Sequence, residues 1–433
     1  MNRKLILFLS AILFLAATTS TAQQAKVAAE TSSSTAKFDE LRSRGFDALY
    51  NLDYEGARRS FRELEKLYPD HPAGMQFLAA TLWAETLNES RRLQSSLYNN
   101  DSFYAKTEDK VDPKVITEFK ELTLKAKNLA QARLKQNPKD VEALYFLGAT
   151  EGLKAAFEGA VQRSFMAALR DGQNSVDRHR NVLKLDPAFH DAELTIGLYD
   201  YVVGSLPLPI KLLASLTGAR GSKRRGLETL QRVARTGKWA CDDASVVLIA
   251  LLKRENRFND ALAISRALGA KYPRNYVFKL ETADALVSQA ALDKASNAKL
   301  AAAEQGEAVQ VLDELLRDRN TRSAAGRSLD LIHFRYGEAL FTAGQPERAA
   351  KEFLAASAVP NAQAGLATMS LLRAAQSQDL AGKRNDALAN YRAVLARPDV
   401  YDAHDEARRG LKQPYHRPTE NKAAPVETAL ESR

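Results

Sequence analysis

Residues 331–360 read LIHFRYGEALFTAGQPERAAKEFLAASAVP, a stretch that predicts two short helices joined by a tight turn. Gly344 is expected to end the first helix, because glycine enters the left-handed conformation at little cost. Pro346 is expected to begin the second, where the N–H group that proline lacks is not needed. The small residues Gly337 and Ala349 allow the two helices to touch, and the space beside them is filled by Tyr336, Leu340, Phe353 and Ala356. One such hairpin leaves an apolar face uncovered, so the stretch predicts a stack of hairpins.

The same pattern returns elsewhere in the chain at the spacing of tetratricopeptide repeats, which is 34 residues. Residues 38–72 read FDELRSRGFDALYNLDYEGARRSFRELEKLYPDHP and contain the glycine, alanine, aromatic residue and terminal proline of that repeat. The corresponding positions are Gly45, Ala57, Phe61 and Pro69. A last repeat near the C-terminus has Gly382, Ala387 and Tyr391. The repeats therefore recur over most of the chain.

The array is expected to be irregular. Residues 73–99 read as one long helix, and residues 140–187 as a pair with an extra helical stretch at 160–172, AVQRSFMAALRDG. A long alanine-rich pair covers residues 276–319. The predicted fold class is therefore all-α: a tetratricopeptide-like solenoid of helical hairpins over residues 38–413, irregular, with lengthened helices in the middle.

The N-terminal 22 residues have the three regions of a secretory signal peptide. A basic head is followed by an apolar run at Leu5–Ala17, which is short for a membrane span, and by the small residues Ser20, Thr21 and Ala22. We expect export to the periplasm, with secretion as an alternative destination and an uncleaved anchor helix as the alternative reading. Residues 23–37 are predicted to be a flexible linker and residues 414–433 a disordered tail.

The sequence gives no pattern typical of an enzyme. It has no Walker loop, no GxSxG elbow and no HExxH. Cys241 is the only cysteine, which excludes an internal disulfide, and its apolar helix predicts a buried thiol rather than a nucleophile. None of the six histidines pairs with another at metal-ligand spacing: His71, His179, His190, His333, His404 and His416. We therefore predict no enzymatic activity, no cofactor and no metal.

A basic turn is the first candidate binding feature. The formal net charge of +9 on 433 residues does not identify a partner by itself. Four of the charges crowd a glycine-flanked turn, at Arg220, Lys223, Arg224 and Arg225, and three more follow on the next helix, at Arg232, Arg235 and Lys238. They could hold an anionic lipid headgroup, the phosphate of a glycan or an acidic tail of a partner. The alternative is a solvated loop. Nucleic acid is not expected as a partner, because no aromatic stacking pattern accompanies the charges.

A concave groove is the second candidate. The first helix of each hairpin lines the groove in arrays of this kind. Register with Gly197 and Gly337 places Tyr201, Lys253, Glu338 and Phe341 there. Mixed aromatic and charged residues suit an extended peptide or a partner helix. The alternative is that extra helices fill the groove and these residues belong to the core.

Residues 197–230, GLYDYVVGSLPLPIKLLASLTGARGSKRRGLETL, resemble a segment of the tetratricopeptide repeat protein 39 / inclusion-body-clearance family. That family has an aromatic-rich helix, an LP pair, a KLL run and a glycine–basic turn leading to GL. The matching positions are Leu206-Pro207, Lys211-Leu212-Leu213, Gly218, Arg224 and Gly226-Leu227. The resemblance implies a helical-repeat adaptor without enzymatic activity.

These observations predict an exported, non-enzymatic scaffold or adaptor that binds protein partners through its concave face. The alternative is an envelope protein that contacts anionic lipid or glycan through its basic turn.

Overall fold

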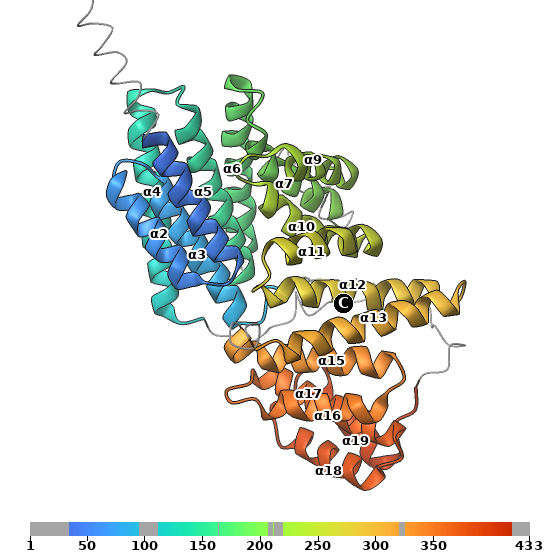
Figure 1. The fold of residues 1–433 in the computed structure, drawn as a ribbon. Coiled ribbons are helices and arrows are strands. Elements are labelled where there is room, and N and C mark those ends of the chain that lie inside the picture. Colours follow the sequence, from blue (N-terminus) through green and yellow to red (C-terminus); the bar gives the residue numbers. More distant parts are fainter. Residues whose placement is uncertain are drawn as a thin grey trace, which may run out of the picture. The chain divides into compact units, whose positions relative to one another are not determined.

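The computed structural model describes residues 34–94, 111–162, 164–206, 211, 220–319 and 325–417 (Figure 1). All regular elements within these ranges are helices, so the all-α prediction is confirmed. No helix in this part of the chain is both long enough and apolar enough to cross a membrane. The predicted signal peptide, most of the predicted linker and residues 418–433 lie outside the described ranges.

Contacts divide the chain into two compact units, each built from helical hairpins of the tetratricopeptide type. The first unit comprises Met1–Trp83 and Asp112–Asp186, and the second comprises Ala84–Val111 and Pro187–Arg433. The sequence predicts one continuous array, and that continuity stays a prediction. The first unit contains a helix at 34–50, α2 Tyr54–Leu67, α3 Ala73–Glu89 up to residue 83, α4 Pro113–Gln136, α5 Val141–Ala160 and α6 Phe165–Leu185.

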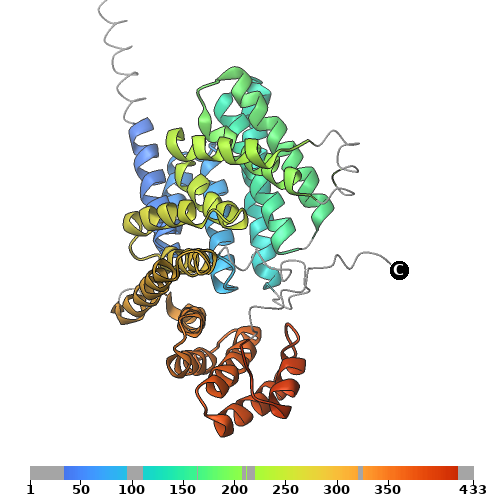
Figure 2. The same cartoon turned by 90° about the vertical axis from the view of Figure 1, so that its right-hand side faces the viewer.

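The second unit contains the end of α3 and the remaining helices, in which each helix packs on the next along the chain (Figures 1 and 2). Its longest helices are α12 and α13, which confirms the long pair predicted at residues 276–319. The elements are η3 His190–Ala192, α7 Glu193–Ser205, α9 Lys223–Thr236, α10 Cys241–Arg254, α11 Phe258–Lys271, α12 Tyr276–Asp293, α13 Ala298–Arg317, η4 Gly326–Ser328, α15 Leu329–Thr342, α16 Pro346–Ala358, α17 Ala364–Leu380, α18 Arg384–Leu395 and α19 Ala403–Lys412.

The hairpin of α15 and α16 has the predicted turn and contact. Gly344 adopts φ +74°, and the N–H of Gln345 donates to the carbonyl of Leu340 at 2.9 Å. This left-handed residue ends α15, and Pro346 is the first residue of α16. A Cβ atom added to Gly337 would lie 2.7 Å from the ring of Phe353, so the two helices meet where only a glycine fits. All the predicted hairpin core residues are buried: Tyr336, Leu340, Ala349, Phe353 and Ala356.

A row of aromatic rings fills the first unit. The ring of Phe61 on α2 lies against Gly45 of the first helix, where a Cβ would be only 2.2 Å away. Phe46 packs edge-on against Phe61 at 5.2 Å and against Phe77 of α3 at 4.8 Å between ring centroids. Phe77 in turn meets Phe146 of α5 at 5.7 Å. Edge-to-face contacts of this kind favour one packing arrangement over others.

Two predicted helix boundaries are wrong. The helix predicted over 73–99 ends at Glu89, because Arg91 adopts φ +62° and the N–H of Arg92 donates to the carbonyl of Leu87 at 2.7 Å. This is the hydrogen bond of a Schellman helix end, with arginine where glycine is usual.

The extra stretch predicted at 160–172 is helical at residues 165–172, but it is not a separate helix. It contributes the end of α5, a turn and the beginning of α6, and α6 then continues to Leu185. The N–H of Ser164 donates to the carbonyl of Glu158 at 2.9 Å and tightens that turn. Gly172 does not break α6, since a single glycine lowers helix stability by only about 1 kcal/mol.

The described residues extend beyond both ends of the solenoid predicted at 38–413. Residues 34–37, predicted to belong to the linker, form the first turn of the first helix. The hydroxyl of Tyr68 donates to the carbonyl of Ser34 at 2.6 Å and holds that turn. At the other end, residues 414–417 of the predicted disordered tail are described, and they contact α15 and α17. Long-range contacts, which local composition does not reveal, account for both differences.

His179 is buried between α5 and α6. Its Nε2–H donates to the carbonyl of Tyr145 at 3.1 Å, and its ring stacks on that of Tyr145 at 5.3 Å between centroids. Burial lowers the pKa of His179 to about 4, against the opposing effect of the hydrogen bond to Tyr145. The imidazole is therefore neutral in the folded protein at pH 7 and serves packing.

We predict that Gly337→Ala lowers the free energy of unfolding by about 1–3 kcal/mol, because the added methyl group must displace the ring of Phe353. Gly306→Ala is the matched control. Gly306 lies within α13 with no atom within 4 Å of an added Cβ, so this change should stabilise the protein by about 0.5–1 kcal/mol. Thermal denaturation of the two variants checks both signs, and destabilisation by both changes would contradict the proposed role of the contact.

We predict that His179 makes stability fall as the pH falls below 6.5. Below that pH the imidazole is protonated in the unfolded state, whereas in the folded state it stays neutral down to about pH 4. The free energy of unfolding should therefore be about 2 kcal/mol lower at pH 5. Melting temperatures measured at pH 7 and pH 5 should differ less in His179→Gln than in the unchanged protein. His416→Gln, at an exposed position, should keep the full difference.

Candidate partner-binding surface

A buried ionic cluster connects α10, α12 and α15 within the second unit. The side chain of Lys253 is 1% exposed, and its ammonium group pairs with Glu281 at 2.7 Å and with Asp284. Burial acts to lower the pKa of Lys253, but the two carboxylates outweigh it and raise the pKa above its usual range. Separating α10 from α12 would leave the buried ammonium without its carboxylates, so the cluster penalises any arrangement of these hairpins that breaks it.

Arg335 of α15 extends this cluster. Its guanidinium donates to Glu338 at 2.6 Å and to the side-chain oxygen of Gln94 at 2.8 Å. Burial opposes the charge of Arg335, but the nearby carboxylates of Glu338, Asp284 and Glu281 raise its pKa. The segment that follows α3 therefore contacts the same helix surface as the ionic cluster.

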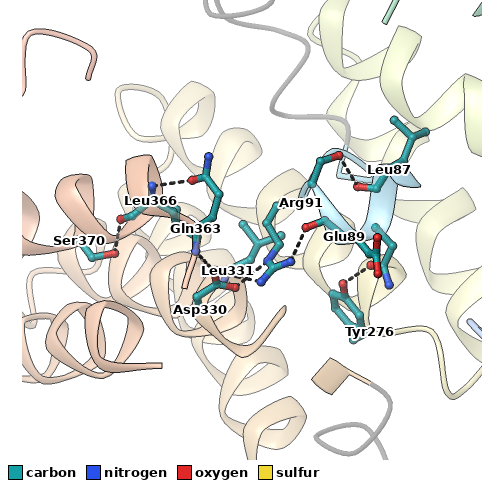
Figure 3. Close-up of polar contacts among 11 residues, drawn as sticks. Leu87, Glu89, Arg91, Tyr276, Asp330, Leu331, Gln363, Leu366 and Ser370 are labelled. Atoms are coloured by element: carbon teal, nitrogen blue, oxygen red, sulfur yellow. Dashed lines mark hydrogen bonds and ion pairs between the residues drawn. The ribbon is translucent and has the colours of Figure 1, made fainter. Parts of the chain in front are cut away.

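Figure 3 shows a second contact of that segment, between Arg91 and Asp330. The Nε of Arg91 donates to one carboxylate oxygen of Asp330 at 2.8 Å, and its Nη2 donates to the other at 3.3 Å. Asp330 also accepts from the backbone N–H groups of Leu331 and Gln363 at 2.8 and 2.9 Å. Both charged side chains are buried, and their pairing accounts for an arginine in the left-handed conformation at the end of α3.

An aromatic and cationic surface lies on α15 and α17. Phe341 of α15 is half-buried, and the guanidinium of Arg373 from α17 lies 5.7 Å from its ring centroid. Beyond α19 the chain returns here, with Arg417 at 5.2 Å and the ring of Tyr415 at 6.1 Å from the ring of Phe341. The N–H of Tyr415 donates to Asp379 of α17 at 2.8 Å. This surface therefore holds a non-helical segment of chain.

The four predicted groove residues differ in their exposure to solvent. Tyr201 is 1% exposed and donates its hydroxyl hydrogen to Glu255 at 2.7 Å, and Lys253 is 3% exposed. For these two residues the placement on an open groove is wrong, because their polar groups are satisfied inside the stack. Glu338 and Phe341 are half-buried and lie one turn apart on α15.

Carboxylates neutralise most of the predicted basic turn. Lys223 pairs with Glu255 at 2.9 Å, and Arg224 pairs with Glu228 at 3.6 Å. The guanidinium of Arg225 makes two hydrogen bonds to the buried Asp200, at 2.5 and 2.8 Å, and they raise its pKa. Three of the four predicted turn residues, Lys223, Arg224 and Arg225, are the first residues of α9, and Arg232 of the same helix makes a similar pair with Glu193. Arg220 is exposed, and within the described residues no ion pair is assigned to it.

Sequence reasoning missed the residues that form the α15–α17 surface together with Phe341: Arg373, Asp379, Tyr415 and Arg417. They come from helices and a terminal segment separated by up to 76 positions. Asp379 stands shortly before Gly382 in the last predicted repeat, a position with no signal for a buried acceptor. The segment that resembles the inclusion-body-clearance family is described only at residues 197–206, 211 and 220–230, and its central run lies outside.

The described residues contain no group of three or more side chains suited to hold a metal ion. Burial and the neighbouring carboxylate of Asp242 raise the pKa of the Cys241 thiol, which disfavours the nucleophilic thiolate. His333 pairs with Glu352 at 2.8 Å across the α15–α16 hairpin.

Comparison with known proteins gives weak similarities in structure. No protein-family model matches the chain, and no curated protein matches it. The human IFIT1 dimer with PPP-AAAA is 12% identical, with a TM-score of 0.40 over 87% of this chain and 84% of that chain. Yeast Tom70 is 11% identical, with a TM-score of 0.35 over 84% of this chain and 86% of that chain. Because these TM-scores are low, the fold is assigned from the helical hairpins themselves.

We predict that Arg91→Ala lowers the free energy of unfolding by about 3 kcal/mol, because Asp330 would keep a buried charge without a cation. Arg224→Ala removes the same side chain from a pair that is 87% and 57% exposed, and should change stability by less than about 0.5 kcal/mol. Urea denaturation compares the two variants. Equal effects would show that burial of the Arg91 pair is unimportant.

Proposed function

We propose that this protein is an exported, non-enzymatic scaffold of helical repeats that binds protein partners through the first helices of its hairpins. The proposal is supported by the contacts of Tyr415 and Arg417 with α15 and α17, which involve the Asp379 carboxylate and the ring and backbone carbonyl of Phe341. Helices that hold one non-helical segment of chain have the donors, acceptors and rings needed to hold another.

The character of the surface supports a polypeptide as the partner. Glu338 and Phe341 are half-buried neighbours on α15, and Arg373 lies over the Phe341 ring. An aromatic ring next to paired charges is a common composition for protein-binding surfaces, because rings supply contact area and charges supply orientation.

The alternative, in which the basic turn contacts anionic lipid or glycan, is not adopted. Lys223, Arg224 and Arg225 already pair with carboxylates. An anionic ligand would have to replace those partners, and removing Arg225 from Asp200 would leave a buried carboxylate without its cation.

We predict that a photo-crosslinking amino acid at Glu338 captures a partner protein in living cells. The same group at Lys351, exposed on α16 of the same hairpin, should capture markedly less. Mass spectrometry of the adducts identifies the partner and its contact residues. Equal capture at both positions, or none at Glu338, would argue against binding through the first helices.

Export forms part of the same proposal and is supported by the three-region pattern of residues 1–22. Mature protein recovered from the periplasm should begin at Gln23, as read by N-terminal sequencing. A product that keeps residues 1–22 and remains in the membrane fraction would indicate an uncleaved anchor instead.

A further inference from the structure

We propose that the surface around Phe341 and Asp379 is a docking site for an extended peptide that carries an aromatic residue followed two positions later by arginine. Tyr415 and Arg417 of this chain occupy the site in cis, and a partner segment of the same chemistry displaces them. This inference rests on the proposed function and adds to it the location of one binding site and the chemistry of its ligand.

The site binds the peptide backbone through Asp379. The carboxylate of Asp379 is fully buried and accepts hydrogen bonds from Arg384 and from the hydroxyl of Tyr391, at 2.9 Å in each case. It also accepts the backbone N–H of Tyr415 at 2.8 Å. The bonds from Arg384 and Tyr391 fix the carboxylate, so it is preorganised to receive an N–H group from an extended segment. This bond does not depend on the side chain that the segment carries there.

Side-chain contacts at Phe341 give the site its preference. The ring of Tyr415 lies 6.1 Å from the ring of Phe341 at 48°, and the guanidinium of Arg417 lies 5.2 Å from that ring. Arg417 also donates to the carbonyl of Phe341, which belongs to the last turn of α15. The carbonyl end of a helix attracts cations, and the face of an aromatic ring does so too. Both features therefore favour arginine at this position of the ligand.

The geometry of the C-terminus explains why this chain fills its own site. Arg384 donates to the carbonyls of Gly410 and Leu411 at 2.7 and 3.3 Å, which fixes the end of α19 beside Asp379. Tyr415 follows that end within a few residues, so its effective concentration at the site is in the millimolar range. Arg417 remains exposed, so the contact is shallow enough for another segment to replace it.

The experiment measures binding of a labelled peptide, KQPYHRPT, which copies residues 412–419. It uses the full chain and the full-chain double variant Tyr415→Pro and Arg417→Ser. The proline removes the N–H donor along with the ring, and the serine removes the cation. We expect the double variant to bind the peptide at least tenfold more tightly than the unchanged chain, as measured by fluorescence anisotropy.

Two controls locate the binding site. A peptide with serine in place of the tyrosine and the arginine should bind the double variant at least tenfold more weakly. Adding Phe341→Ala to the double variant should weaken binding of the original peptide to a similar extent. Circular dichroism spectra confirm that each protein keeps its helices.

Three results would overturn the inference. The first is no binding of the peptide to the double variant at 1 mM, which is on the order of the effective concentration of Tyr415 at the site. The others are equal binding by the unchanged chain and the double variant, and binding that Phe341→Ala does not affect. Crosslinking at Glu338 separates this inference from the proposed function. Partner capture there without peptide binding would leave the scaffold standing and reject this site.

Discussion

Close contact between a glycine and an aromatic ring sets the separation of paired helices at three places in this chain, and the stacking of helices there depends on that separation. Phe61 lies over Gly45, Phe353 lies over Gly337, and the ring of Tyr391 lies over Gly410 of α19. An added Cβ at each of these glycines would lie between 2.2 and 2.7 Å from the ring, closer than real side chains approach. At these three places the paired helices therefore have a fixed separation on which the neighbouring helices can stack.

Where hairpins stack, buried charged side chains find their partners on neighbouring hairpins. Lys253 on α10 finds its carboxylates on α12, and Arg91 after α3 finds Asp330 on α15. Such pairs contribute little net stability compared with apolar residues of the same shape, but they penalise any arrangement that separates them. They consequently act as registration points, whereas the aromatic and aliphatic core supplies the bulk of the driving force.

Local features of this fold could be predicted from the sequence, and long-range pairings could not. Gly344, Pro346 and the spacing of small residues act within one hairpin, so their roles follow from neighbouring positions. The burial of Tyr201 and Lys253 depends on Glu255, which follows α10, and on Glu281 of α12, both later in the chain. Arg91 and Asp330 are 239 positions apart. Of the predicted groove residues, Glu338 and Phe341 are half-buried, and the terminal segment contacts Phe341.

The buried carboxylates of this chain therefore have two roles, and the role depends on whether the donor belongs to the helical stack or to another segment. Where both members are buried, as in Lys253 with Glu281, the pair belongs to the stack and offers nothing to a partner. Where an acceptor is buried but its donor comes from a segment outside the hairpins, as with Asp379 and Tyr415, the donor is replaceable. The Asp379 carboxylate, which Arg384 and Tyr391 already hold, can accept a backbone N–H group from either polypeptide. A repeat with such a fixed acceptor can therefore bind an extended segment of its own chain or, in its place, an extended segment of another protein.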